Sequence, residues 1–294
     1  MGLKKENRGI RIVAHIVFIV LTIFCLLPFL LLLSSSVSSV ESIAAHGYNI
    51  IPFELDFSAY TYLFGAWNII GKAYLMTIVV TVIGTVGSVL VSTMLAFGLA
   101  WRKTPGKSAV TLCLVISMLF NGGAVSSYII WTNLFHVQDT LFALILPNLF
   151  MSAFTVIMYC NYFKNSISLE LMEAAEIDGA NMFQIYFRIY LPLAVPIIGV
   201  LGLTTVLAYW NDWNNGLYYI SDQNLYTIQL VLRNMQESAK WIASNPDANI
   251  DTSTIPGANV QMAVAVLGIL PIAIAYPFFQ KYFVAGIAIG GVKE

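Results

Sequence analysis

Charged residues are scarce in this 294-residue chain, at 10% of the sequence against 59% for hydrophobic residues. A soluble domain carries about 25% charged residues. Together with a mean hydropathy of +0.79, this scarcity excludes an ordinary water-soluble globular protein and predicts a chain that lipid solvates. The net charge of −1 says little about partners, since in a membrane protein the sidedness of charge matters more than its sum. We expect no nucleic-acid partner.

Cysteine and histidine are too few and too dispersed for a metal centre or a disulfide framework. The three cysteines lie in apolar runs without C-x-x-C spacing, and we expect them to be small buried hydrophobes: Cys25, Cys113 and Cys160. The three histidines form no H-E-x-x-H pattern: His15, His46 and His136. With no nucleophile–base set either, we expect no catalytic residue, no metal and no enzymatic activity.

A nucleotide site is also lacking. Gly106-Lys107-Ser108 resembles the end of a phosphate-binding loop, but Trp101 stands where that loop needs a glycine. We therefore expect this chain to bind no cofactor, so uphill transport would draw its energy from another subunit or from an ion gradient. An ion-coupled carrier usually places ionisable residues inside its spans, and none of the apolar runs has a charge near its middle. This favours a partner ATPase.

Six apolar runs, most of them about 20 residues long, can cross a bilayer. They predict an all-α membrane protein of one domain over residues 1–294, with spans near 12–33, 73–101, 109–131, 141–163, 193–209 and 260–279. A signal peptide is the alternative for 12–33, but the run exceeds the usual length of a signal-peptide core, which favours a retained helix. Asn121-Gly122-Gly123 interrupts the third run, so a helix ending near Phe120 and an outer re-entrant segment is the other interpretation. Gly84, Ser88, Ser92 and Ala96 place a stripe of small residues on the second span, which favours close helix packing.

Basic residues are distributed unequally between the two sides that six spans define. Eleven of the fourteen fall on the side of the termini: Lys4, Lys5, Arg8, Arg11, Arg102, Lys103, Lys107, Lys164, Arg188, Lys281 and Lys293. The other side has Lys72, Arg233 and Lys240. The positive-inside rule predicts that both termini and the 164–192 connection are cytoplasmic. The 210–259 loop would then lie outside, with a surface helix at about 226–243.

The 164–192 connection has the pattern of two short helices joined by a turn. Ser168 is a candidate N-cap, and Glu170, Glu173 and Glu176 form an acidic stripe that either water screens or a partner's basic residues neutralise. Gly179 can take the left-handed conformation that ends the first helix. The second helix would bury Phe183, Phe187 and Tyr190 and stop at Pro192. Partner docking and a solvated surface loop both fit this pattern.

This connection resembles the EAA loop of permease subunits of binding-protein-dependent ABC importers. The residues that match are, in order, Glu173-Ala174-Ala175, Gly179, Ile189 and Leu191-Pro192. Glu176-Ile177-Asp178-Gly179-Ala180 and the stretch 276–283 resemble the carbohydrate branch, whose members have the maltose-permease-like type I fold. Phe120-Asn121-Gly122-Gly123 and residues 139–147 resemble the LplC type, although that type often has proline where this chain has Ser126.

The resemblance implies a mechanism, a set of partners and a bacterial cytoplasmic membrane location. A dimer of ATP-binding subunits, which uses ATP and Mg²⁺, would grip the loop of this chain and of a second, different permease subunit. An extracytoplasmic solute-binding protein would deliver a sugar or oligosaccharide. The coupling residues would be Glu173, Ala174, Ala175, Glu176, Asp178, Gly179, Ile189, Leu191 and Pro192.

Aromatic and amide residues gather at the outer end of the fifth span: Trp210, Asn211, Asp212 and Trp213. Tyrosine and tryptophan at a membrane interface are commonly anchors. The other interpretation is a sugar path, because aromatic faces pack on pyranose rings while Asn and Asp bind hydroxyls; the pattern resembles its counterpart in carbohydrate permeases. A peptide, phosphonate or other solute remains the alternative cargo. A membrane sensor or scaffold without transport is the alternative function.

Overall fold

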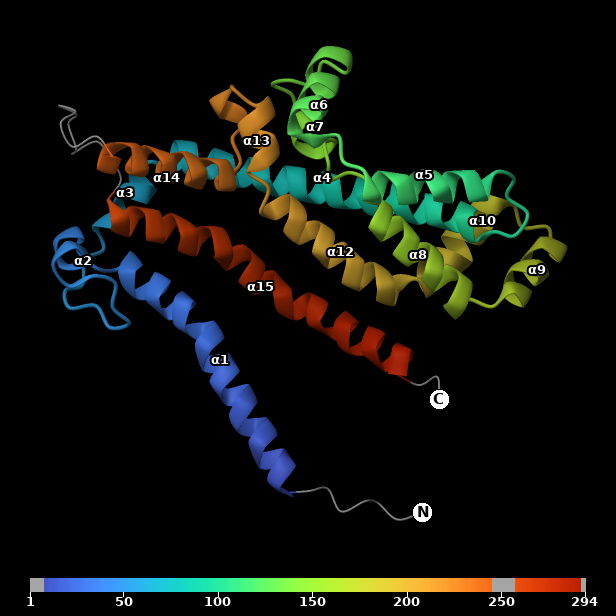
Figure 1. Cartoon of the computed structure of the whole chain (residues 1–294), viewed down its shortest axis with the longest axis horizontal. Helices are drawn as coiled ribbons and strands as arrows, with labels where there is room; N and C mark the ends of the chain where they lie inside the picture. The colour runs from blue at the N-terminus through green and yellow to red at the C-terminus, as the bar shows by residue number, and fades with distance from the viewer. Residues whose placement is uncertain (1–7, 245–256, 292–294) are drawn as a thin grey trace. The chain divides into compact units, whose positions relative to one another are not determined.

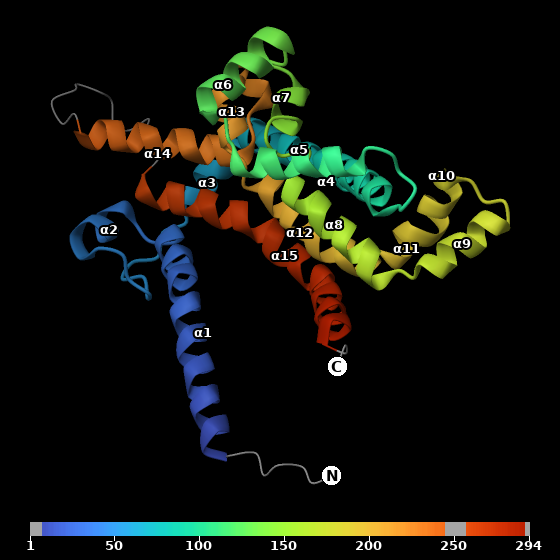
Figure 2. The same ribbon diagram turned by 45° about the vertical axis from the view of Figure 1, so that its right-hand side comes forward.

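The computed structural model describes residues 8–244 and 257–291, which are almost entirely helical (Figure 1, Figure 2). The helices are α1 (Arg8–Ser36), α2 (Val40–His46), α3 (Ser58–Gly65), α4 (Trp67–Ala100), α5 (Lys107–Leu119), α6 (Gly123–Ile129), η1 (Ile130–Leu134), α7 (Leu141–Ile145), α8 (Ala153–Ser166), α9 (Leu169–Ile177), α10 (Met182–Ile185), η2 (Tyr186–Tyr190), α11 (Leu191–Leu193), α12 (Val195–Trp210), α13 (Asn214–Tyr219), η3 (Gln223–Leu225), α14 (Ile228–Ser244) and α15 (Ala258–Gly291). Within the described ranges, β pairing is limited to an isolated bridge between Ser38 and Leu55. The all-α prediction is confirmed. Lys4, Lys5, Lys293 and residues 245–256 lie outside the described residues.

Contacts divide the chain into two compact units, Met1–Ile70 with Leu232–Pro271 and Gly71–Val231 with Ile272–Glu294. In the first unit, polar contacts hold the connection after α1. The hydroxyl of Ser39 accepts a hydrogen bond from the backbone N–H of Ser42 at 3.2 Å, which caps α2, and it donates to a carboxylate oxygen of Glu54 at 2.9 Å. These bonds satisfy backbone and side-chain groups at the point where the apolar helix gives way to a polar loop.

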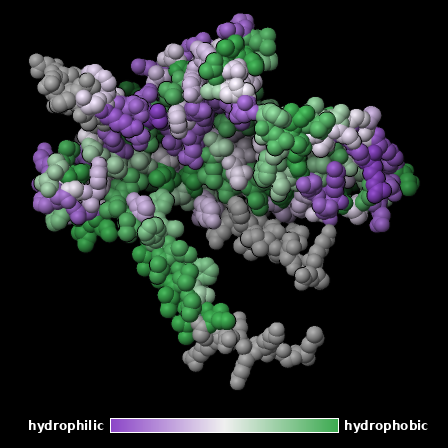
Figure 3. All heavy atoms as spheres, viewed as in Figure 1, coloured by the Kyte–Doolittle hydropathy of each residue, from purple (hydrophilic) through white to green (hydrophobic). Residues whose placement is uncertain are grey.

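Three helical stretches of the described chain are long and apolar enough to cross a bilayer: Ile10–Ser36, Trp67–Ala100 and Ala258–Pro277. The pair Met182–Leu193 and Val195–Trp210, bent by 80°, makes a fourth if it counts as one span. Helix α1 exposes its apolar side chains on all sides, which is typical of a helix that lipid or a partner covers (Figure 3). Cys25 on α1 and Cys113 on α5 are exposed for the same reason, so the predicted cysteine burial is correct only for Cys160.

The second unit has its core where the end of α4 meets α8 and the segment after it. Tyr159, Phe163 and Ile185 are at most 1% exposed there. The small-residue stripe on α4 is buried as predicted, with Ser88, Ser92 and Ala96 no more than 4% exposed. At Gly84, a Cβ would lie 2.5 Å from the ring of Tyr209, so only glycine allows this helix contact.

Two of the predicted spans are not continuous helices. In 109–131, α5 ends at Leu119 and a new helix begins at Gly123, whose φ is +82°. This is the alternative interpretation, a helix ending near Phe120. In 141–163, α7 ends at Ile145 and α8 begins only at Ala153. Pro147 has no N–H to donate, and Asn148 has a φ of +62°, which together stop the helix. The predicted surface helix at 226–243 is present as α14.

Replacing Gly84 by alanine should destabilise the protein by about 1–3 kcal/mol, because the added methyl group overlaps the Tyr209 ring. That ring cannot move freely, since its hydroxyl donates a hydrogen bond to the carbonyl of Ile145 at 3.0 Å. Gly98 lies on the same helix with nothing within 4 Å of a Cβ, so Gly98→Ala is the matched control. Thermal unfolding of the detergent-solubilised protein should show a lower midpoint for Gly84→Ala alone; equal midpoints would contradict this account.

Candidate functional site

The segment from Leu169 to Leu193 consists of a regular helix, a tight turn and an irregular helix. Ser168 caps α9 as predicted, since its hydroxyl accepts from the N–H of Leu171 at 3.4 Å. Glu170 lies in the first turn, where the helix dipole favours a carboxylate. Figure 3 shows a hydrophilic surface over α9, in contrast to the hydrophobic surface of α5.

The turn after α9 depends on glycine. Gly179 has a φ of +80°, as predicted, and donates its N–H to the carbonyl of Glu176 at 3.0 Å. The N–H of Ala180 reaches back to the carbonyl of Ala175 at 2.9 Å, which satisfies the end of the helix. Asn181 and Gln184 then form a reciprocal capping box that starts α10. Local hydrogen bonds therefore define the turn on both sides.

The predicted buried face of the second helix is wrong at two of three positions. Tyr190 is buried, but Phe183 and Phe187 are 65% and 49% exposed, and Ile185 and Tyr186 are buried instead. The cause is η2, a π-helical turn, which adds a residue to the repeat and rotates the buried face.

The helix ends one residue after the predicted stop at Pro192. Helix α11 continues directly from η2 and ends at Leu193, and the 80° bend comes at Ala194.

The structure separates the EAA-loop residues into exposed and packed positions. Glu173, Ala174, Asp178, Gly179 and Pro192 are exposed, Glu176, Ile189 and Leu191 are half-buried, and Ala175 is buried. The exposed ones on α9 leave a surface with small and acidic side chains. The packed ones fix the orientation of α9 relative to the second helix.

One member of the acidic stripe is neutralised within the chain. The ammonium of Lys103, in the α4–α5 loop, lies 2.9 Å from a carboxylate oxygen of Glu176. Within 8–244 and 257–291, no such ion pair is found for Glu170 or Glu173. Sequence reasoning missed this pair because charge counting predicts only the side of the membrane for Lys103 and not the residue that it faces.

An aromatic cluster anchors the segment to α4. The ring of Phe97 packs edge-on against Tyr190 at a centroid distance of 4.8 Å, and it lies tilted against Tyr186 at 5.6 Å. The hydroxyl of Tyr190 lies 3.2 Å from the sulfur of Met172 on α9. The α9 helix is therefore attached through Tyr190 to the long helix α4.

A buried hydrogen bond joins η2 to α4. The hydroxyl oxygens of Tyr186 and Thr93 are 2.8 Å apart. Because Thr93 donates its own proton to the carbonyl of Val89 at 2.6 Å, Tyr186 is the donor in this pair. No sequence signal pointed to Thr93, which lies 93 residues away from its partner.

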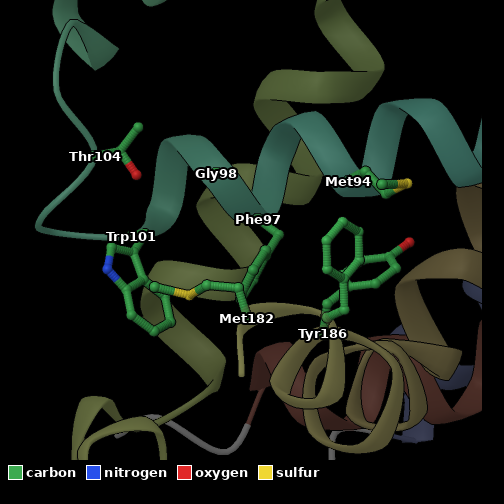
Figure 4. Close-up of a pocket in the computed structure, with 8 residues that line it drawn as sticks. Met94, Phe97, Gly98, Trp101, Thr104, Met182 and Tyr186 are labelled. Carbon is green, nitrogen blue, oxygen red and sulfur yellow. The ribbon is translucent and has the colours of Figure 1, made fainter. Parts of the chain in front are cut away.

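An apolar pocket of about 280 Å³ opens beside this cluster (Figure 4). Met94 and Phe97 of α4, with Trp101 just after this helix, line one wall, and Met182 and Tyr186 line the other. Gly98 leaves the floor open, because it has no side chain. The pocket shows that the second helix is not packed tightly along its whole length, so this end of α4 has room for movement or for an apolar group.

The residues at the end of α12 are used largely within the chain. Trp210 is 5% exposed, whereas Asn211 is exposed and Trp213 is half-buried. Asp212 accepts from the backbone N–H groups of Asn214 at 3.0 Å and Asn215 at 3.3 Å. Burial raises the pKa of Asp212, and these two hydrogen bonds partly offset that rise. Asn211 and Trp213 are therefore the more accessible members of the predicted sugar path.

A second carboxylate, that of Asp139, joins two loops that are distant in the sequence. Asp139, whose φ is +52°, accepts from the N–H groups of Ser221 and Asp222, and its own N–H donates to the carbonyl of Tyr219 at 3.0 Å. The two accepted bonds lower the pKa of Asp139. The tie is therefore present at neutral pH and would weaken only as the pH falls through that lowered pKa.

The hydrogen bond between Tyr186 and Thr93 should stabilise the protein by about 1 kcal/mol, as a buried neutral bond does. Tyr186→Phe and Thr93→Val should each lower the unfolding midpoint. The double variant should lose no more than the larger single loss, because both changes remove one interaction. Tyr162→Phe is the control, because its hydroxyl donates an exposed hydrogen bond to the carbonyl of Leu193 at 3.2 Å that water can replace. Strictly additive losses would show that the two hydroxyls act independently.

Comparison with known proteins identifies the chain. Residues 88–289 match the family described as binding-protein-dependent transport system inner membrane component. The polygalacturonan/rhamnogalacturonan transport system permease protein YtcP of Bacillus subtilis (strain 168) is 33% identical over 98% of this chain and 99% of its own length. Protein LplC of the same organism is 33% identical over 91% and 89%.

A solved structure agrees. A chain from a bacterial ABC transporter involved in the import of the acidic polysaccharide alginate superposes with a TM-score of 0.80 at 26% identity, covering 96% of this chain and 99% of that one. The EAA-loop resemblance, the all-helical fold and these matches agree: the chain belongs to the family of inner membrane components of binding-protein-dependent transport systems.

Proposed function

We propose that this chain is the permease subunit of an ATP-driven importer and forms half of the path for a sugar or oligosaccharide. The cargo class is supported by relatives named for polygalacturonan/rhamnogalacturonan, arabinooligosaccharides and alginate. ATP and Mg²⁺ are used by separate ATP-binding subunits, and this chain contributes no cofactor. A solute-binding protein outside the bacterial cytoplasmic membrane delivers the cargo to the 210–259 loop.

The single observation that carries the coupling role is the surface of α9. Glu173 and Ala174 are exposed beside the Gly179 turn, and the small alanine permits close approach by a partner. Lys103 already neutralises Glu176, so Glu170 and Glu173 remain for basic residues of an ATP-binding subunit. Their mutual repulsion along α9 is relieved when such a partner docks. The cluster of Phe97, Tyr186 and Tyr190 then passes a movement of α9 to α4.

We propose six membrane crossings with cytoplasmic termini. The crossings are α1, α4, the broken stretches 107–134 and 141–166, α12 and α15. A helix of 13 residues such as α5 is about 20 Å long, which is less than the hydrocarbon thickness. The non-helical backbone at 120–122 and 146–152 must then be covered by protein or face water. A second permease subunit, packed against these breaks, would supply that cover.

Uptake measurements test the proposed function. The accumulation of labelled solutes would be compared between cells that carry the gene and a deletion strain. The panel contains oligogalacturonides, alginate-derived oligosaccharides, arabino-oligosaccharides, a peptide and a phosphonate. We expect at least one oligosaccharide to lose its ATP-dependent uptake on deletion, and reintroduction of the gene to restore it. Loss of peptide or phosphonate uptake alone would overturn the cargo class, and unchanged uptake of every solute would overturn the transport role.

Replacing Gly179 by aspartate should abolish uptake while the protein still inserts in the membrane. A non-glycine residue at a φ of +80° costs about 1–2 kcal/mol, and the added carboxylate alters the docking surface. Gly106 is also in the left-handed conformation, with a φ of +73° and open space around it, so Gly106→Asp is a matched control. Uptake should survive in the control and fall to background in Gly179→Asp. Equal uptake by the two variants would remove the coupling role from this turn.

A further inference from the structure

Three basic side chains line a single pocket at the loop between α4 and α5. Arg102 and Lys107 come from this loop and the start of α5, and Lys164 from the last turn of α8. The pocket has a volume of about 350 Å³, and no acidic side chain is among the described residues that line it. Arg102 and Lys164 form no ion pair within the described residues. Three cations around one space repel each other, so an anion would stabilise the arrangement.

Backbone contacts hold Lys107 in the loop that borders the pocket. The ammonium of Lys107 donates to the carbonyls of Arg102 at 3.2 Å and Trp101 at 3.5 Å, which folds the loop back on itself and leaves the charge uncompensated. The pocket also lies at the N-terminus of the 13-residue helix α5, whose dipole adds partial positive charge. A planar guanidinium and two ammonium groups suit a phosphate group.

The remaining walls are apolar, which separates this pocket from a site for a soluble anion. Phe163, Ile167 and Tyr190 line it and are buried. From it, α5 leads away with exposed apolar side chains such as Val110 and Leu112, which are 41% and 59% exposed. A molecule with a phosphate at one end and hydrocarbon chains at the other matches both parts.

We propose that this pocket binds the phosphate of an anionic phospholipid from the inner leaflet, with its acyl chains along α5. The proposal rests on the cytoplasmic orientation given under the proposed function. Leu169, the first residue of α9, also lines the pocket, and Tyr190 links it to Met172 of the same helix. An anionic lipid in this pocket contacts the start of α9 and the residue that anchors it. The lipid composition of the membrane therefore affects the stability of the α9 surface proposed for coupling.

Lipid retention tests the proposal on the full chain in its purified transporter. The complex is equilibrated in nanodiscs of phosphatidylcholine with phosphatidylglycerol, and retained lipids are counted by native mass spectrometry. A basic residue near an anionic lipid surface contributes about 1 kcal/mol, so Arg102→Gln with Lys164→Gln should reduce the preference for phosphatidylglycerol by about 25-fold. Arg102→Lys with Lys164→Arg keeps both charges and should retain the lipid. High salt should weaken retention in the wild type.

The control removes two cations elsewhere: Lys72→Gln with Lys240→Gln, both at exposed positions outside the pocket. Equal retention by the wild type and the Arg102/Lys164 double variant, or equal loss in the control, would overturn the proposal.

Binding of inorganic phosphate with lipid retention unchanged by the variant would make this a site for free phosphate. Loss of the co-purifying ATP-binding subunit with unchanged lipid would assign the pocket to an acidic segment of that partner. A complex that retains phosphatidylglycerol but imports no oligosaccharide would overturn only the proposed function.

Discussion

Hydrocarbon offers no hydrogen-bond partner, and the arrangement of this chain depends on that constraint. Its long apolar segments are helices because only a helix satisfies its backbone within one segment. Three hydroxyls of these helices also bond within their own helix: Thr22, Thr77 and Thr93 each donate to a carbonyl four residues earlier. In the proposed six crossings, the helix breaks at 120–122 and 146–152 leave backbone that needs cover from elsewhere. The need for a second subunit in the proposed transporter thus has a physical origin in those breaks.

The segment proposed to meet the ATP-binding subunit combines an exposed surface with a firm attachment. On α9, Glu173 and Ala174 remain accessible. Beneath it, Tyr190 and Tyr186 pack on Phe97, and the hydroxyl of Tyr186 reaches Thr93. A surface that docks a partner but is loosely held would not transmit motion, whereas these contacts connect it to a 34-residue helix. The neighbouring apolar pocket allows the second helix to shift without breaking a tightly packed core.

Charge has three separate uses on the side of the chain that carries α9. Lys103 neutralises one carboxylate of the acidic stripe. Glu170 and Glu173 are the carboxylates of this stripe that we propose to meet basic residues of a partner. Arg102, Lys107 and Lys164 concentrate positive charge around a pocket with apolar walls. The positive-inside rule treats all these cations alike, but their surroundings differ. Lys103 forms an ion pair within the chain, whereas Arg102, Lys107 and Lys164 line the proposed lipid site.

Local patterns were enough to predict the helical class, the Ser168 cap, the Gly179 turn, the small-residue face of α4 and the family resemblance. Each depends on residues close in the chain or on composition. The folded chain was needed to locate the helix breaks after Leu119 and Ile145, the bend at Ala194 and the buried face of the second helix, Ile185, Tyr186 and Tyr190. It also decided the pairs Lys103–Glu176 and Thr93–Tyr186, because their partners lie 73 and 93 residues apart. The physical reason is that a π-helical turn changes the periodicity on which face prediction relies, and distant pairings leave no local trace.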